Sequence, residues 1–157
     1  MERVRATVAL DCTLSHAETA LPAVFESRRD ARGTIRWPLR VSLEDFGLPL
    51  DVDLEHQVEI HVERRRDEQN LNEVYAIDWR ASDDGPLPDF QGHMILWAED
   101  DPSCCYLELD GTYEPPLGRL VGAAFDATIG HLIAERTVKV FLDDVADAVS
   151  AKHSGRT

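Results

Sequence analysis

The chain has 157 residues, of which 43% are hydrophobic and 29% charged, and this composition is that of one ordinary globular domain. Its formal net charge of −14 argues against nucleic acid as a partner, because phosphate binding needs clustered lysine and arginine. Neither membrane insertion nor export is expected, since the chain holds no run of roughly 18 apolar residues and Met1–Arg5 starts no apolar signal segment.

The N-terminal segment predicts a half-buried strand followed by two short helices. Apolar and polar residues alternate, and one face of the strand carries Val4, Ala6, Val8, Leu10 and Cys12. Ser15–Glu18 then has the form of a capping box, in which a serine hydroxyl and a glutamate carboxylate bond the first amides of a helix. Proline lacks an N–H and clashes inside a helix, so Pro22 predicts a break and a second helix from Pro22 to near Ser27. A polar loop, 28–33, follows.

Consecutive strands with short turns are predicted from residue 34 onward, which is typical of an antiparallel meander. The clearest strand alternates over residues 52–62, with valine, leucine and isoleucine on one face and mostly acidic residues on the other. Pro38 cannot donate a hydrogen bond to a neighbouring strand and therefore predicts an edge strand or a break. The expected turns lie at 46–49, 66–70, 82–89 and 100–102.

The stretch Leu109–Gly118, LDGTYEPPLG, marks the passage from the last strand to a long final helix. A proline pair is out of place inside a sheet but is accepted at the entry to a helix. From Leu117 to about Val149 no proline interrupts the chain. Two apolar sets follow at helical spacing: the first is Leu117, Leu120, Val121, Ala124, Phe125, Thr128, Ile129, Leu132 and Ile133, and the second is Val138, Phe141, Leu142, Val145 and Val149. The helix therefore buries more than one side, either against a curved sheet or against a partner subunit.

This element order resembles the helix-grip fold, an α+β fold in which a curved antiparallel sheet of six or seven strands grips a long C-terminal helix. The chain also resembles a bacterial branch of the START-related (SRPBCC) superfamily, which includes polyketide cyclases and lipid-transfer domains. The resemblance lies in the order of the elements, in the strand start Phe90–Gly92 and in the segment Gly111–Gly118. The resemblance covers nearly the whole chain and implies one domain over residues 1–151 with a disordered tail at 152–157. Only Gly47 stands where plant members carry a glycine-rich loop, so a phosphate ligand is not expected there.

The resemblance implies that a hydrophobic or aromatic small molecule binds in a cavity between the sheet and the last helix. His56, Glu73 and Tyr113 are polar residues at inward positions, and a few such groups orient an apolar ligand. Because the acidic surface discourages contact with anionic membranes, a soluble metabolite is favoured over transfer of lipid between membranes. The expected ligand contacts are Trp37, His56, Glu73, Tyr75, Trp79, Met94, Tyr113, Val121, Phe125 and Thr128.

Two alternatives stay open beside ligand binding. The first is a polyketide cyclase or aromatase-like enzyme in which His56 and Glu73 act as an acid–base pair and Tyr113 places the substrate. Because polar residues on an apolar face are more often structural, the catalytic residues stay unassigned. The second alternative is an interaction protein whose cavity is filled by its own large side chains, which are Trp37, Trp79, Phe90, Met94 and Phe125.

No metal or other cofactor is expected. His56 and His61 are five residues apart on a strand and face opposite ways, and no second histidine lies four residues away on a helix. The three cysteines, Cys12, Cys104 and Cys105, fit neither a disulfide framework nor a zinc site. We expect reduced thiols in a cytoplasmic protein.

Two further groups of residues lie outside the expected core. On the final helix, Asp126, His131 and Glu135 are placed to reach the cavity mouth, although His131 and Glu135, four apart, also fit an ordinary surface pair. An outward apolar patch on one strand suits dimerisation rather than ligand binding, and together with the second side of the helix it is compatible with a homodimer. This patch consists of His93, Ile95 and Trp97.

Overall fold

The computed structural model describes residues 2–42, 53–66, 73–81, 89–101, 103–114 and 127–154. Within these ranges the elements follow one another as β1 (Glu2–Leu10), α1 (Leu14–Glu26), β2 (Ile35–Ser42), β3 (Asp53–Arg66), β4 (Glu73–Ala81), β5 (Asp89–Trp97), β6 (Cys105–Glu114) and α2 (Ala127–Ser154). The strands form one antiparallel sheet in the order β1-β6-β5-β4-β3-β2. The predicted antiparallel meander is therefore confirmed, and Pro38 lies in an edge strand, β2, as expected.

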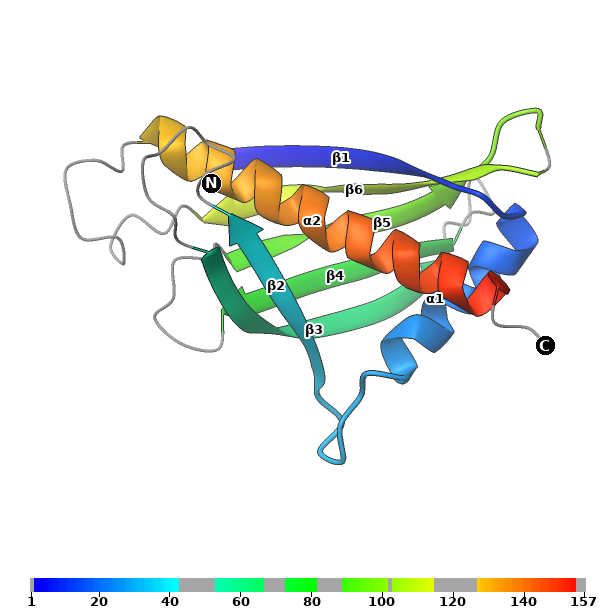
Figure 1. Ribbon diagram of the computed structural model, residues 1–157, viewed down its shortest axis with the longest axis horizontal. Coiled ribbons are helices and arrows are strands. Elements are labelled where there is room, and N and C mark those ends of the chain that lie inside the picture. The colour runs from blue at the N-terminus through cyan, green and yellow to red at the C-terminus, as the bar shows by residue number, and fades with distance from the viewer. Residues whose placement is uncertain are drawn as a thin grey trace.

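The sheet curls around α2, while α1 lies against the C-terminal half of that helix (Figure 1). α2 contacts β1 and β2, the two edge strands, and also β6. The helix therefore spans the gap between the edges of the sheet, which also helps to shield the edges from other chains. A curved antiparallel sheet closed around a long C-terminal helix is the α+β helix-grip arrangement that the element order predicted.

The concave face of the sheet and one side of α2 form the core. Alternate strand residues face inward and are buried, as the sequence alternation predicted. The second apolar set of the final helix is fully buried in the same core, so the alternative that a partner subunit covers it is wrong. This set consists of Val138, Phe141, Leu142, Val145 and Val149, each 0% exposed.

α1 is one continuous helix with Pro22 inside it, so the predicted division into two short helices is wrong. Buried residues fall at helical spacing on both sides of the proline. Burial of a large apolar side chain contributes about 1.5 to 3 kcal/mol, and several of them together outweigh the roughly 3 kcal/mol that a proline costs inside a helix. The buried residues of α1 are Ala17, Ala20, Leu21, Val24 and Phe25.

The N-terminus of α1 is capped by Thr13 rather than by Ser15. The Thr13 side-chain oxygen accepts a hydrogen bond from the backbone N–H of His16 at 3.1 Å. The predicted capping box at Ser15–Glu18 is therefore wrong, because Ser15 already lies inside the helix.

α2 continues to Ser154, past the expected end near Val149. The predicted start of this helix at Leu117 lies outside the described residues, as do the expected turn at 46–49 and most of those expected at 66–70 and 82–89. In the part of the chain that the structure describes, neither helix is apolar over a length that would cross a membrane.

Gly92 and Gly111 lie opposite each other on β5 and β6 and make room for an aromatic ring. A Cβ atom added at Gly92 would lie 2.3 Å from the backbone oxygen of Asp110 and 2.8 Å from Cζ of Phe90. A Cβ atom at Gly111 would lie 2.6 Å from the same Cζ atom. The Phe90 ring therefore lies over the glycine pair, in space that two side chains would otherwise occupy.

Candidate functional site

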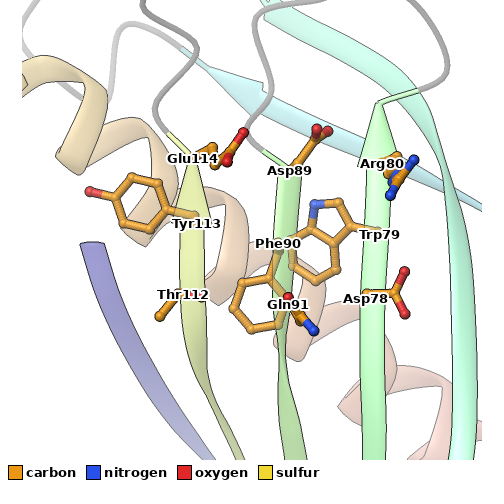
Figure 2. Close-up of a pocket in the computed structure, with 9 residues that line it drawn as sticks. All are labelled: Asp78, Trp79, Arg80, Asp89, Phe90, Gln91, Thr112, Tyr113 and Glu114. Carbon is orange, nitrogen blue, oxygen red and sulfur yellow. The ribbon is translucent and has the colours of Figure 1, made fainter. Parts of the chain in front are cut away.

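An aromatic row crosses the sheet near the point where β4 and β6 end and β5 begins. Trp79 of β4 pairs with Phe90 of β5, and Phe90 pairs with Tyr113 of β6. Inward positions recur every second residue, so the register places one aromatic residue from each strand side by side. The rings of Trp79 and Phe90 stack with centroids 4.5 Å apart, while Tyr113 points away from them (Figure 2). All three residues are buried.

Tyr113 connects the sheet to α2. Its phenolic oxygen lies 2.5 Å from Nδ1 of His131, and Nε2 of His131 lies 2.9 Å from Oε1 of Glu135, one turn further along the helix. Tyr113 is 1% exposed, whereas the side chains of His131 and Glu135 are 37% and 52% exposed. The Tyr113–His131–Glu135 chain therefore leads from the buried end of the aromatic row to the solvent.

The chemistry of these groups fixes the direction of the hydrogen bond between His131 and Glu135. The ionised carboxylate of Glu135 can only accept, so Nε2 of His131 carries a proton and donates it. In a neutral imidazole the other ring nitrogen then accepts, and Nδ1 receives the hydroxyl proton of Tyr113. His131 thus donates to Glu135; Tyr113 donates to Nδ1 of a neutral imidazole and accepts from Nδ1 of a protonated one.

A pocket of about 360 Å³ is lined by residues of β4, β5 and β6. Trp79, Phe90 and Tyr113 contribute to its lining, together with polar residues of the same three strands. Figure 2 shows Glu114, Asp89 and Arg80 at the strand ends with the two stacked rings below them, whereas Asp78 lies past Trp79, further from the end of β4. Six of the nine lining residues are polar and have the strand parity opposite to that of the three rings, which are at most 2% exposed. The polar residues of the lining are Asp78, Arg80, Asp89, Gln91, Thr112 and Glu114.

Aromatic side chains fill the middle of the space between the sheet and α2. Phe141 of α2 contacts Trp37 with ring centroids 5.3 Å apart and Trp79 with centroids 4.9 Å apart. Trp37 also contacts Phe25 of α1 at 5.9 Å. A continuous set of rings therefore runs from Phe25 to Phe90, and the predicted ligand wall at Trp37 is used for internal packing.

Trp37 is also held by two charged residues. The Arg28 guanidinium lies over the indole ring, 3.8 Å from its centroid, and the indole N–H donates to Asp144. Partial burial is the main cause that raises the pKa of the Asp144 carboxyl, and the hydrogen bond from Trp37 offsets part of this rise. This cluster ties the end of α1, the edge strand β2 and α2 together.

Five of the predicted ligand contacts lie buried on the concave face: Trp37, Tyr75, Trp79, Met94 and Tyr113. The structure brings only Trp79 and Tyr113 of these into the aromatic row. Val121 and Phe125 lie outside the described residues, as do the side chains of His56, Glu73 and Thr128.

The backbone register separates His56 from Glu73. Glu73 pairs with Arg66 at one end of β3, whereas His56 lies ten residues away on that strand and pairs with Leu39 of β2. At about 3.3 Å per residue, roughly 33 Å of strand separates the two positions. The structure therefore does not bring them together as an acid–base pair.

His131 and Glu135 were expected to reach the cavity mouth or to form an ordinary surface pair. Their i, i+4 pair is present, as the spacing predicted. The sequence pattern did not indicate that Nδ1 of the same histidine would meet Tyr113. The one available signal was that His131 lies in the helix that directly follows the strand of Tyr113.

Within the described ranges, the other titratable and nucleophilic side chains are not arranged in this way. Among the described residues, no group of three histidine, cysteine or acidic side chains is arranged to hold a metal ion. The three cysteines are free; burial, together with the neighbouring Cys12 thiol, raises the pKa of Cys105 to about 12. On the outer face, Trp97 stacks on Tyr106 with ring centroids 4.4 Å apart, and His93 is exposed, which confirms the predicted outward parity.

Comparisons with known proteins bear on the fold. No protein-family model matches the chain, and no curated protein matches it. Among solved structures, a conserved protein from Geobacillus kaustophilus is 10% identical, with 94% of this chain and 95% of that chain covered and a TM-score of 0.51. Ara h 8.0201 is 11% identical, with 99% of both chains covered and a TM-score of 0.51. The protein TTHA0849 from Thermus thermophilus is 15% identical, with 96% and 99% covered and a TM-score of 0.47. At these identities the first two share the fold alone.

Proposed function

We propose that this protein binds a hydrophobic or aromatic small molecule at the end of the sheet, where the aromatic row meets α2. The observation that carries the proposal is the row of aromatic rings enclosed between the curved sheet and α2, with the buried Tyr113 hydroxyl at its end. Aromatic surface with a few fixed polar groups suits a flat apolar ligand that carries one polar substituent.

The helix-grip arrangement supports this reading. We further propose that the chain belongs to a bacterial branch of the START-related superfamily, in which the space between sheet and helix is a ligand cavity. Three free cysteines are typical of a reducing compartment, so a cytoplasmic location is part of the proposal. Association into a homodimer through the face around Trp97 stays a proposal of the same kind.

A second candidate is an interaction protein whose cavity is filled by its own side chains. The continuous ring contacts from Phe25 through Trp37 and Phe141 to Trp79 favour it. The two candidates differ in one measurable respect, because only the ligand binder is stabilised by small molecules.

The test is a thermal-shift titration with fatty acids, sterols and aromatic polyketides. A ligand present at 100 times its Kd stabilises the folded state by about 2.7 kcal/mol, which raises the Tm of a chain of this length by about 5 to 10 °C. We expect an aromatic ligand to give such a shift and Tyr113→Phe to reduce it. Tyr106→Phe, on the outer face of the same strand, is the matched control and should leave the shift unchanged. No shift with any class would favour the self-filled interaction protein.

A further inference from the structure

The outer face of the sheet carries a second aromatic pair, at the opposite end of β6 from Tyr113. Trp97 and Tyr106 face each other across the β5–β6 hairpin and stack with ring centroids 4.4 Å apart. Both residues are only partly buried. On its other side Tyr106 pairs with Ala9 of the edge strand β1, which is exposed and has no side-chain atom beyond Cβ. The aromatic pair is therefore open to contact from the side of β1.

A hollow of about 550 Å³ begins at Ala9 and continues between β1 and α2. The charged residues of its lining are all acidic: Asp11 follows directly after β1, and Asp143 and Asp147 lie on α2. Asp11 and Asp147 are exposed, and Asp143 forms an ion pair with Lys139 at 3.1 Å. The end of β1, the β5–β6 hairpin and the C-terminal half of α2 lie at the same end of the molecule (Figure 1). The hollow therefore continues from the aromatic pair toward the helix.

Acidic residues also border the aromatic pair on the hairpin. The negative charge of Glu99 is the main cause that raises the pKa of the Tyr106 hydroxyl, and Asp101 adds to this rise. The basic residue Arg5, on the outer face of β1, is held in an ion pair by Glu108. The faces of aromatic rings attract cations, and the surrounding carboxylates strengthen this attraction. The chemistry of this surface therefore suits a positively charged partner.

We propose that the outer aromatic pair and the acidic hollow together bind a basic segment of a partner protein. One arginine of the segment stacks on Tyr106, and neighbouring basic residues pair with Asp11 and Asp147. Arginine fits better than lysine, because its planar guanidinium stacks on aromatic rings. This acidic–aromatic surface consists of Ala9, Asp11, Trp97, Tyr106, Asp143 and Asp147.

A second copy of this chain is the other occupant proposed for the face around Trp97. Each copy carries a formal net charge of −14, so a homodimer through this surface brings like charges together. A basic segment has the complementary charge and is favoured for that reason. The surface lies on the outside of the sheet, apart from the proposed ligand site, so this inference does not depend on the proposed function.

Two labelled peptides of equal charge test the surface. One alternates glycine with arginine, and the other alternates glycine with lysine. Their dissociation constants are measured by fluorescence anisotropy at about 25 mM and about 150 mM NaCl, because salt screens exposed charges. We expect the wild type to bind the arginine peptide about threefold more tightly than the lysine peptide, as a cation–π contact allows. Both peptides should bind more weakly at the higher salt concentration.

Two double variants separate the rings from the charges. Trp97→Thr with Tyr106→Thr removes both rings and keeps residues that suit a strand, so the two peptides should bind equally. Asp11→Asn with Asp147→Asn removes two carboxylates from the hollow. This change should weaken both peptides by about threefold to tenfold and keep the preference for arginine. Circular dichroism checks that each variant is folded.

A third double variant is the matched control. Glu59→Gln with Glu63→Gln removes the same charge from exposed positions of β3, on the far side of the sheet from β1. The dissociation constants of this control should stay within about twofold of the wild type, because the two positions lie more than a Debye length from the hollow.

A preference for arginine that is lost with the rings, and a loss of affinity confined to the asparagine variant, support the inference. Equal weakening in the β3 control would show non-specific attraction to an acidic protein and would overturn the inference. An arginine preference that persists without the rings, or no binding of the arginine peptide by the wild type, would also overturn it. Sedimentation velocity tests the other occupant: a wild-type dimer that the loss of the rings dissociates would assign the surface to a second copy instead.

Discussion

The glycine pair under Phe90 gives the sharpest stability prediction. In Gly92→Ala, the new Cβ atom would lie 2.3 Å from the backbone oxygen of Asp110 and 2.7 Å from Cα of Gly111. The first contact is about 1.2 Å shorter than an ordinary carbon contact of about 3.5 Å. Both atoms belong to the backbone of a central strand, so β5 and β6 must separate locally or bend.

The expected cost of Gly92→Ala is about 3 kcal/mol in the free energy of unfolding, which corresponds to a loss of about 6 to 12 °C in Tm. Urea unfolding followed by circular dichroism measures it. Gly33→Ala is the control, since a Cβ atom there meets nothing within 4 Å and the cost, about 1 to 2 kcal/mol, comes only from the positive φ of 83°. Adding Phe90→Leu to Gly92→Ala should not restore stability, because the backbone contacts persist. A Gly92→Ala cost no larger than that of Gly33→Ala would refute the close packing of the two strands.

Three other features of the structure can be tested in the same way. Pro22→Ala should raise the free energy of unfolding by about 1 to 2 kcal/mol in urea titrations, because the substitution restores a helical hydrogen bond inside α1. A lower free energy of unfolding in the variant would contradict this prediction. Because the pKa of Cys105 is about 12, about one thiol in 10⁴ is ionised at pH 8. A disulfide reagent should therefore leave Cys105 unlabelled in the native protein and label it in urea. Rapid labelling of the native protein would contradict the burial of Cys105. The pKa of the Asp144 carboxyl is higher in the folded protein than in the unfolded chain, where it is near 3.9. The contribution of this carboxyl to stability therefore falls as the pH rises from the unfolded pKa through the folded pKa. Asp144→Asn should therefore gain stability relative to the wild type between pH 4 and pH 7, and a difference independent of pH would count against this.

The sheet could be predicted from the sequence because alternation fixes which residues of a strand face inward. Val58 and Ile60 are buried as their spacing indicated, and the antiparallel pairing follows from short turns between consecutive strands. α1 was predicted less well. The rule that proline interrupts a helix predicted a break at Pro22. Buried residues on both sides of the proline instead stabilise one continuous helix.

The site was harder to predict, because it depends on register between strands and on the position of a helix over the sheet. His56 and Glu73 have the inward parity of their strands, but parity does not give distance along a strand. The expected hairpin at 66–70 already placed the start of β4 beside Arg66, far from His56, and counting through that turn would have separated the pair. The contact between Tyr113 and His131 depends on where α2 lies over β6, which no periodicity in the sequence specifies.

Native mass spectrometry of the purified protein, with the same sample denatured for comparison, tests most directly whether this fold holds a small molecule. We expect a bound aromatic compound that is released on denaturation. The matched preparation of Tyr113→Phe should carry less of it. Protein that is free of ligand as purified, and unchanged in Tm by fatty acids, sterols and aromatic polyketides, would contradict the binding function and identify the rings from Phe25 to Phe90 as a self-filled core.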